Sequence, residues 1–170
     1  MVQFKFIFGG VVLLYTMGFS NVSSDSIFER LFVYKIGVIV DVRGKPYSRY
    51  VPQSNREYVA GYAKDVGIRY LWAGEHLSGF GTASVLDLSF SEKMAKVLDL
   101  QKSNNVVLMC SEADPKKCHR AYKLCAWVHR NSDVNPVHIV KDGAIDSREF
   151  ENKQRPDWLW FDFGGKRGLE

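Results

Sequence analysis

The chain has 170 residues, of which 46% are hydrophobic, 25% charged and 14% aromatic. These values match or exceed globular averages, which excludes a disordered chain, a collagen-like fibre and a disulfide-dense miniprotein. The 23 Lys and Arg outnumber the 19 Asp and Glu by four, which permits an anionic partner without indicating nucleic acid. We predict one domain over residues 1–167 and interpret 168–170 as a remnant of tagged expression.

The predicted elements alternate between strands and helices. Continuous β-branched and apolar runs predict five buried strands, at residues 11–17, 36–42, 68–72, 106–109 and 137–140. Amphipathic spacing predicts four helices, at residues 27–35, 55–66, 89–102 and 115–130. The second helix has a capping box, Ser54 with Glu57, and a C-terminal glycine, Gly67. Ser89 and Glu92 form the capping box of the third, and we expect residues 73–88 before it to be a loop.

Helices of ten or more residues between strands call for parallel pairing through right-handed crossovers. The sequence therefore predicts the α/β class, as a three-layer α/β/α sandwich around a mostly parallel sheet of about five strands. The aromatic segment after Pro156 we expect to pack against this domain.

The apolar run over residues 6–19 resembles the core of a signal peptide. It follows a single nearby lysine, lacks a small-residue cleavage site and falls short of the ~20 residues that span a bilayer. We therefore expect a buried strand and no membrane association. The three cysteines cluster within residues 110–125 and are odd in number, which favours a reducing cytoplasm over a secreted disulfide framework.

Polar residues follow the predicted strands at the edge where ligands bind in parallel sheets. They are Ser20, Asn21, Asp41, Arg43, Glu75, His76, Cys110, Ser111 and Glu112. Cys110 ends a strand and precedes a helix that Asp114 and Pro115 begin. Backbone amides and the helix dipole would stabilise a thiolate there and could hold an anion beside it. The alternative is that Cys110 is a small core residue.

The other cysteines have different expected roles. Cys118 could approach Cys110 if the loop folds back, giving a dithiol that cycles through a disulfide. Cys125, two helical turns after Cys118, is expected in the core. Zinc binding by Cys110, Cys118 and His119 is disfavoured because adjacent Cys and His chelate poorly and no fourth ligand is evident. We predict no metal and no cofactor.

Several other residues at this edge have two readings. Asp41 and Arg43 could hold an anion or form a structural ion pair. Glu75 and His76 could act as acid or base, or be inert surface residues. Aromatic and cationic side chains near the same edge would allow nucleobase stacking, namely Tyr47, Arg49, Tyr50 and Trp72.

Three segments resemble the domain of unknown function 488 family. They are residues 15–21, residues 40–49, and the block of residues 108–112 with Pro115, Cys118, His119 and Arg120. The resemblance covers about residues 14–139 and implies an α/β fold of cytosolic microbial proteins without an established activity.

A weaker likeness, to rhodanese sulfurtransferases and cysteine phosphatases, rests on Asp41 and Arg43 after one strand and Cys110 after another. It implies a thiolate in an anion-binding loop. The position six residues after Cys110, where those phosphatases carry arginine, is Lys116.

We therefore predict a cysteine-centred enzyme that acts on a small anionic molecule containing sulfur or phosphate. The expected catalytic residues are Cys110, Asp41, Glu112 and Cys118. The expected substrate-binding residues are Ser20, Asn21, Arg43, Tyr47, Ser48, Arg49, Glu75, His119 and Arg120, with the two arginines neutralising the anion. The alternative is a non-catalytic module that binds a nucleotide or nucleic acid at the same edge.

Overall fold

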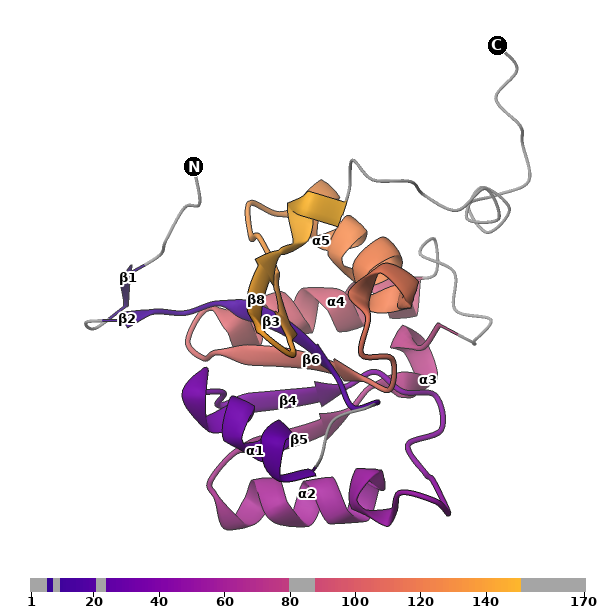
Figure 1. The fold of residues 1–170 in the computed structure, drawn as a ribbon. Coiled ribbons are helices and arrows are strands. Elements are labelled where there is room, and N and C mark those ends of the chain that lie inside the picture. The colour runs from indigo at the N-terminus through magenta and orange to yellow at the C-terminus, as the bar shows by residue number, and fades with distance from the viewer. Residues whose placement is uncertain (1–5, 8–9, 21–23, 80–87, 151–170) are drawn as a thin grey trace, which may run out of the picture.

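A computed structural model of the protein describes residues 6–7, 10–20, 24–79 and 88–150. Its main sheet has six strands in the order β5-β4-β6-β3-β7-β8 (Figure 1). These are β3 (Leu14–Gly18), β4 (Val38–Asp41), β5 (Arg69–Trp72), β6 (Val106–Cys110), β7 (Val137–Val140) and β8 (Gly143–Asp146). All neighbours pair in parallel except β7 and β8, which are antiparallel. Two short strands, β1 (Phe6–Ile7) and β2 (Gly10–Val11), form a separate antiparallel pair.

Helices cover both faces of the main sheet. They are α1 (Ser24–Val33), α2 (Arg56–Asp65), α3 (Gly74–Leu77), α4 (Leu88–Gln101) and α5 (Ala126–Asn131). Successive strand residues face opposite sides, so Ile39 and Met109 pack with α1 and α2, whereas Val40 and Leu108 pack with α3, α4 and α5. Figure 1 shows α1 and α2 on one side of the sheet and α4 and α5 on the other. The predicted three-layer α/β fold is confirmed.

Several sequence predictions need correction. The sheet has a sixth strand, β8, which was not predicted, and residues 74–77 of the expected loop form the short helix α3. The predicted first strand begins later, at Leu14. Ser54 lies in a 3-10 turn (Pro52–Ser54), so Asn55 rather than Ser54 precedes α2, and its side chain makes no cap hydrogen bond. Gly67 follows α2 with a φ of 76°, in the left-handed conformation that a C-terminal glycine favours.

The predicted helix over residues 115–130 is three pieces. A 3-10 turn (Pro115–Lys117) begins at Asp114, whose side chain accepts a hydrogen bond from the Lys116 amide, as expected of an N-cap. The backbone then becomes extended at Cys118, with φ −115° and ψ 136°, before a π-helical turn (Arg120–Cys125) leads into α5. At this break, Cys118 Sγ lies within 4.8 Å of the sulfur of Cys110, the last residue of β6. The aromatic segment after Pro156 lies outside the described residues.

Candidate functional site

A cavity of about 920 Å³ opens at the carboxyl ends of β3, β4, β5 and β6. Its walls come from the loops that follow these four strands and from the segment over residues 117–122. The lining residues are Ser20, Arg43, Gly44, Lys45, Gly74, Glu75, Ser78, Gly79, Cys110, Ser111, Glu112, Lys117, Cys118, His119 and Tyr122. The cavity thus lies at the sheet edge where the sequence places the polar residues, and its volume suits a small-molecule ligand.

Two thiols and an imidazole form one wall of the cavity. His119 Nδ1 lies 3.7 Å from Cys110 Sγ and 3.8 Å from Cys118 Sγ. All three side chains are buried, and Cys110, 7% exposed, is the more accessible of the two cysteines. The hydrogen bond from Cys118 lowers the pKa of the Cys110 thiol well below its ordinary value, aided by His119 and by the backbone amide of Glu112. The pKa of Cys118 is raised, because a thiolate at Cys110 holds its proton and burial favours the neutral form.

The same three residues are the candidate metal ligands of the described chain. Their ligand atoms lie within 4.8 Å of one another, so the break at Cys118 overcomes the poor chelate geometry expected of adjacent Cys and His. They would supply three of the four ligands of a tetrahedral zinc site. No fourth acidic, cysteine or histidine ligand joins this cluster among the described residues.

Arg120 anchors the loop after β6 through hydrogen bonds to its backbone. Its side chain is fully buried, and its guanidinium donates to the carbonyl oxygens of Glu112 and Ala113. Its Nε donates to Thr16 Oγ1 on β3 over 3.1 Å. The same Thr16 oxygen is hydrogen-bonded to His138 Nδ1, 2.6 Å away on β7. Arg120 therefore ties the cysteine loop, residues 111–114 after β6, to two strands of the sheet.

Gly18 lets the cysteine loop lie directly on β3. A Cβ added at this residue would come within 1.8 Å of the Glu112 carbonyl oxygen and 2.8 Å of Arg120 Nη1. The next residues continue the attachment, since the Ser20 amide donates to the Ser111 carbonyl and Ser20 Oγ accepts from the Ala113 amide. The loop is held on both sides, so its conformation is fixed by the fold.

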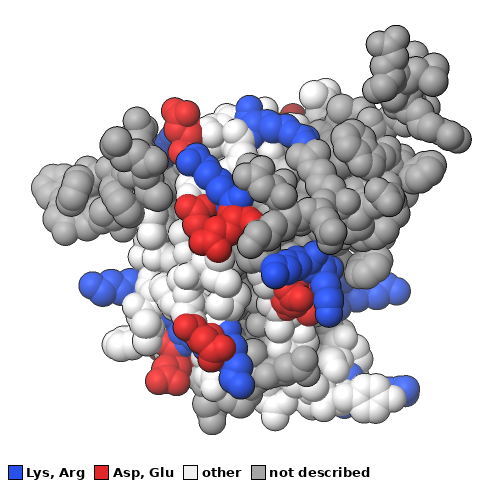
Figure 2. Space-filling view, turned by 45° about the horizontal axis from the view of Figure 1, so that its top comes forward, with Lys and Arg blue, Asp and Glu red and all other residues white. Residues whose placement is uncertain are grey.

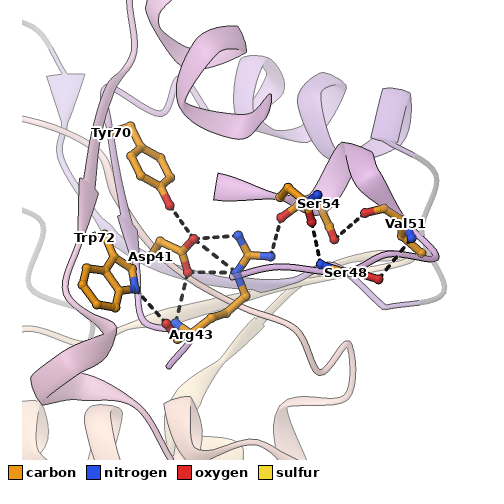
Figure 3. Close-up of polar contacts among 8 residues, drawn as sticks. Asp41, Arg43, Ser48, Val51, Ser54, Tyr70 and Trp72 are labelled. Carbon is orange, nitrogen blue, oxygen red and sulfur yellow. Dashed lines mark hydrogen bonds and ion pairs between the residues drawn. The ribbon is translucent and has the colours of Figure 1, made fainter. Parts of the chain in front are cut away.

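Asp41 and Arg43 form a buried ion pair beside the cavity (Figure 3). Arg43 Nη2 lies 2.6 Å from Asp41 Oδ2, and Arg43 Nη1 donates to the Ser54 carbonyl oxygen. Tyr70 donates its hydroxyl proton to Asp41, and the Trp72 indole donates to the Arg43 carbonyl. Burial and the nearby carboxylate raise the pKa of Tyr70 far above its ordinary value. The guanidinium is thus engaged by the protein, in the arrangement of a structural ion pair.

The structure brings together only part of the predicted set. Ser20, Arg43, Glu75, Cys110, Glu112, Cys118 and His119 line the cavity. Asp41 and Arg120 are buried behind its wall and bonded to the protein. Tyr47, Ser48 and Arg49 are not among the lining residues, and Asn21 lies outside the described residues. His76 also stays out of the lining, with Nε2 3.8 Å from the Glu75 carboxylate.

Some lining residues could not be selected from the amino-acid pattern. Lys117 and Tyr122 line the cavity from either side of the backbone break at Cys118, which periodicity does not reveal. Gly79 lies against the imidazole of His119, and a Cβ there would be 2.9 Å from its ring atoms. The glycines of the predicted loop over residues 73–88 were the available signal for this contact, because glycine permits a close approach of the backbone to another group.

The comparisons with known proteins identify one family. The model of the family described as Domain of unknown function DUF488 matches residues 23–84 and 82–122. The chain belongs to this family. The matched region includes Cys110, Cys118, His119 and Arg120, so the residues that build the thiol wall and its anchor lie inside it. The search of curated proteins and the search of solved structures each found no match.

Proposed function

We propose that the protein is a cysteine-dependent enzyme in which the Cys110 thiolate attacks a small anionic substrate. The observation that carries the proposal is the place of Cys110 Sγ, on the wall of a cavity and beside both Cys118 and His119. A buried cysteine that served only as packing would not need two polar neighbours and an open cavity. The lowered pKa of Cys110 agrees with this role, because the thiolate is the nucleophile.

The substrate's anionic group would meet the lysines of the cavity. Lys45 and Lys117 are exposed lining residues whose ammonium groups can turn toward a ligand. We assign positioning roles to Arg43 and Arg120, because their guanidinium groups donate to protein atoms. Asp41 correspondingly orients Arg43. Ser20, Ser78 and Ser111 add hydroxyl groups to the wall, which also carries the carboxylates of Glu75 and Glu112. This assignment keeps the thiolate nucleophile expected from the likeness to rhodaneses. It moves the anion contacts from the two arginines, which the sequence analysis selected, to Lys45 and Lys117.

A small molecule fits the site better than a nucleic acid. Tyr47 and Tyr50 are 74% and 80% exposed and could stack on bases, but neither lines the cavity. On the face that Figure 2 presents, Lys and Arg side chains lie next to Asp and Glu rather than forming a continuous basic surface.

Within the part of the chain that the structure describes, none of the helices has the length and apolar character needed to cross a membrane.

The test is the alkylation rate of each cysteine against pH, measured on the folded protein by iodoacetamide labelling and peptide mass spectrometry. We expect Cys110 to be labelled at pH 6, well below the ~8.5 midpoint of a free thiol, whereas buried Cys125 stays unlabelled. Cys125 is the internal control, because it lies in the same chain and outside the cavity lining. A Cys110 no more reactive than Cys125 would refute the proposal.

A further inference from the structure

The second thiol of the site is placed to react with the first. The sulfur atoms of Cys110 and Cys118 lie within 4.8 Å of each other, and both residues line the cavity. Cys118 is 2% exposed against 7% for Cys110, so Cys110 presents the larger surface to an incoming molecule. A disulfide has a sulfur–sulfur length of ~2.05 Å, which side-chain rotation must supply.

The backbone around Cys118 favours this reaction. Cys118 sits between the 3-10 turn and the π-helical turn, in an extended conformation that belongs to neither. Irregular helical turns of this kind recur at functional sites. The Cys118 amide donates to the Pro115 carbonyl and its carbonyl accepts from the Ala121 amide, so the backbone is held here and the sulfur atoms close by rotation of the side chains. Cys125, within the π-helical turn and outside the cavity lining, lacks this position.

We infer that Cys118 is the resolving thiol of Cys110, and that the substrate belongs to the class of small anionic disulfides. This inference rests on the proposed function, in which Cys110 is the nucleophile. It selects sulfur over phosphorus, since a second thiol beside the nucleophile has a direct use in disulfide exchange and none in hydrolysis of a phosphate ester. The lysines Lys45 and Lys117 would meet carboxylates of the disulfide's substituents.

The reaction proceeds in two balanced steps. The Cys110 thiolate attacks one sulfur of the substrate R–S–S–R, forming a mixed disulfide Cys110–S–S–R and releasing R–S⁻. His119 Nδ1, 3.8 Å from Cys118 Sγ, then takes the proton of the Cys118 thiol. The Cys118 thiolate attacks Cys110 Sγ and expels the second R–S⁻. The protonated imidazole returns its proton to the solvent or to a departing thiolate. Two electrons have passed from the protein dithiol to the substrate, and a second dithiol must reduce the protein before another turnover.

His119 is suited to accept that proton. Its Nε2 is buried and finds no hydrogen-bond partner among the described residues, so Nδ1 is the nitrogen through which the ring exchanges a proton with the two thiols. Nδ1 faces both sulfur atoms. Gly79 packs against the ring and holds it in this orientation.

Glutathione disulfide is the probe for the test, applied to the reduced protein with acid quenching and intact-mass spectrometry. In the wild-type protein we expect an internal Cys110–Cys118 disulfide, no lasting adduct and two glutathione thiols released per protein. In Cys118→Ser we expect one thiol released and a stable adduct on Cys110. Cys110→Ser should form neither product, and Cys125→Ser, the matched control, should behave like the wild type.

Each remaining outcome contradicts a particular step. A wild-type adduct that persists as long as that of Cys118→Ser would overturn the resolving role while leaving Cys110 a nucleophile. Failure of Cys110 to react with iodoacetamide would remove the proposed function and this inference together. One equivalent of zinc in the purified protein, released as the thiols react, would overturn the inference because both sulfurs would be ligands. If Cys118→Ser does not fold, as judged by circular dichroism, Cys118→Ala replaces it.

Discussion

Arg120→Lys should destabilise the protein by about 3 kcal/mol while keeping its charge. The guanidinium donates to three acceptors, Thr16 Oγ1 and the carbonyls of Glu112 and Ala113. A lysine ammonium at the end of a flexible stem cannot satisfy three acceptors arranged for a planar fork. It leaves two of them unbonded, and each lost bond to a charged donor costs ~1.5 kcal/mol or more.

The assay is urea unfolding followed by circular dichroism, with the free energies compared at equal m values. Arg148→Lys is the matched control, because Arg148 is exposed and a conservative surface change is expected to stay within ~0.5 kcal/mol. A loss below ~1 kcal/mol for Arg120→Lys would refute the assignment of Arg120 as the anchor of the cysteine loop.

A double-mutant cycle isolates one bond of this anchor. Thr16 Oγ1 lies between Arg120 Nε and His138 Nδ1, so Thr16→Val removes a partner from both. We expect the combined Thr16→Val and Arg120→Lys variant to lose about 1 kcal/mol less than the sum of the single losses, since both remove the same contact. Additivity within ~0.3 kcal/mol would show that the two side chains act independently.

Three further changes test the surroundings of the site. Tyr70→Phe removes the bond to Asp41 and should cost about 1 kcal/mol in urea unfolding; no loss would mean that the bond contributes nothing. Burial lowers the pKa of His138 to about 3, so the unfolded chain binds the proton first as pH falls below ~6.5. The resulting loss of stability is about 2 kcal/mol at pH 5 and should be absent in His138→Asn; an unchanged pH profile would contradict it. Gly18→Ala drives a methyl group into the Glu112 carbonyl and should cost about 3 kcal/mol, whereas wild-type stability would show that the loop can move aside.

The alternation of strands and helices could be predicted because both depend on local patterns. Runs such as residues 36–42 and 106–109 are apolar and β-branched, which suits strands buried on both faces. Once the strands are parallel, the chain direction alone places Cys110 at the ligand-binding edge. β8 could not be predicted, since its four residues, Gly143–Asp146, show no strand pattern and pair only because β7 lies beside them.

The role of Arg120 could not be predicted from its own surroundings in the sequence. Arginine is almost never fully buried unless it is paired, and the adjacent lysines and histidine suggest a charged surface. Its acceptors come from residue 16 and residues 112–113, so only the tertiary structure brings them together. The break at Cys118 is equally hidden, because Asp114 and Pro115 are typical of a helix start whether or not the helix continues.

The buried charge of Arg120 supports the thiolate of the proposed function. Its three acceptors are neutral oxygens, and it makes no ion pair with a carboxylate within the described parts of the chain. A buried cation is costly unless an anion compensates it. The hydrogen bond to Cys110 and burial raise the pKa of Cys118, and Arg120 acts in the opposite direction, so its field favours a negative charge at Cys118. In the proposed function, Cys110 carries the negative charge of the pair while Cys118 keeps its proton, and Arg120 anchors the loop beside this charge.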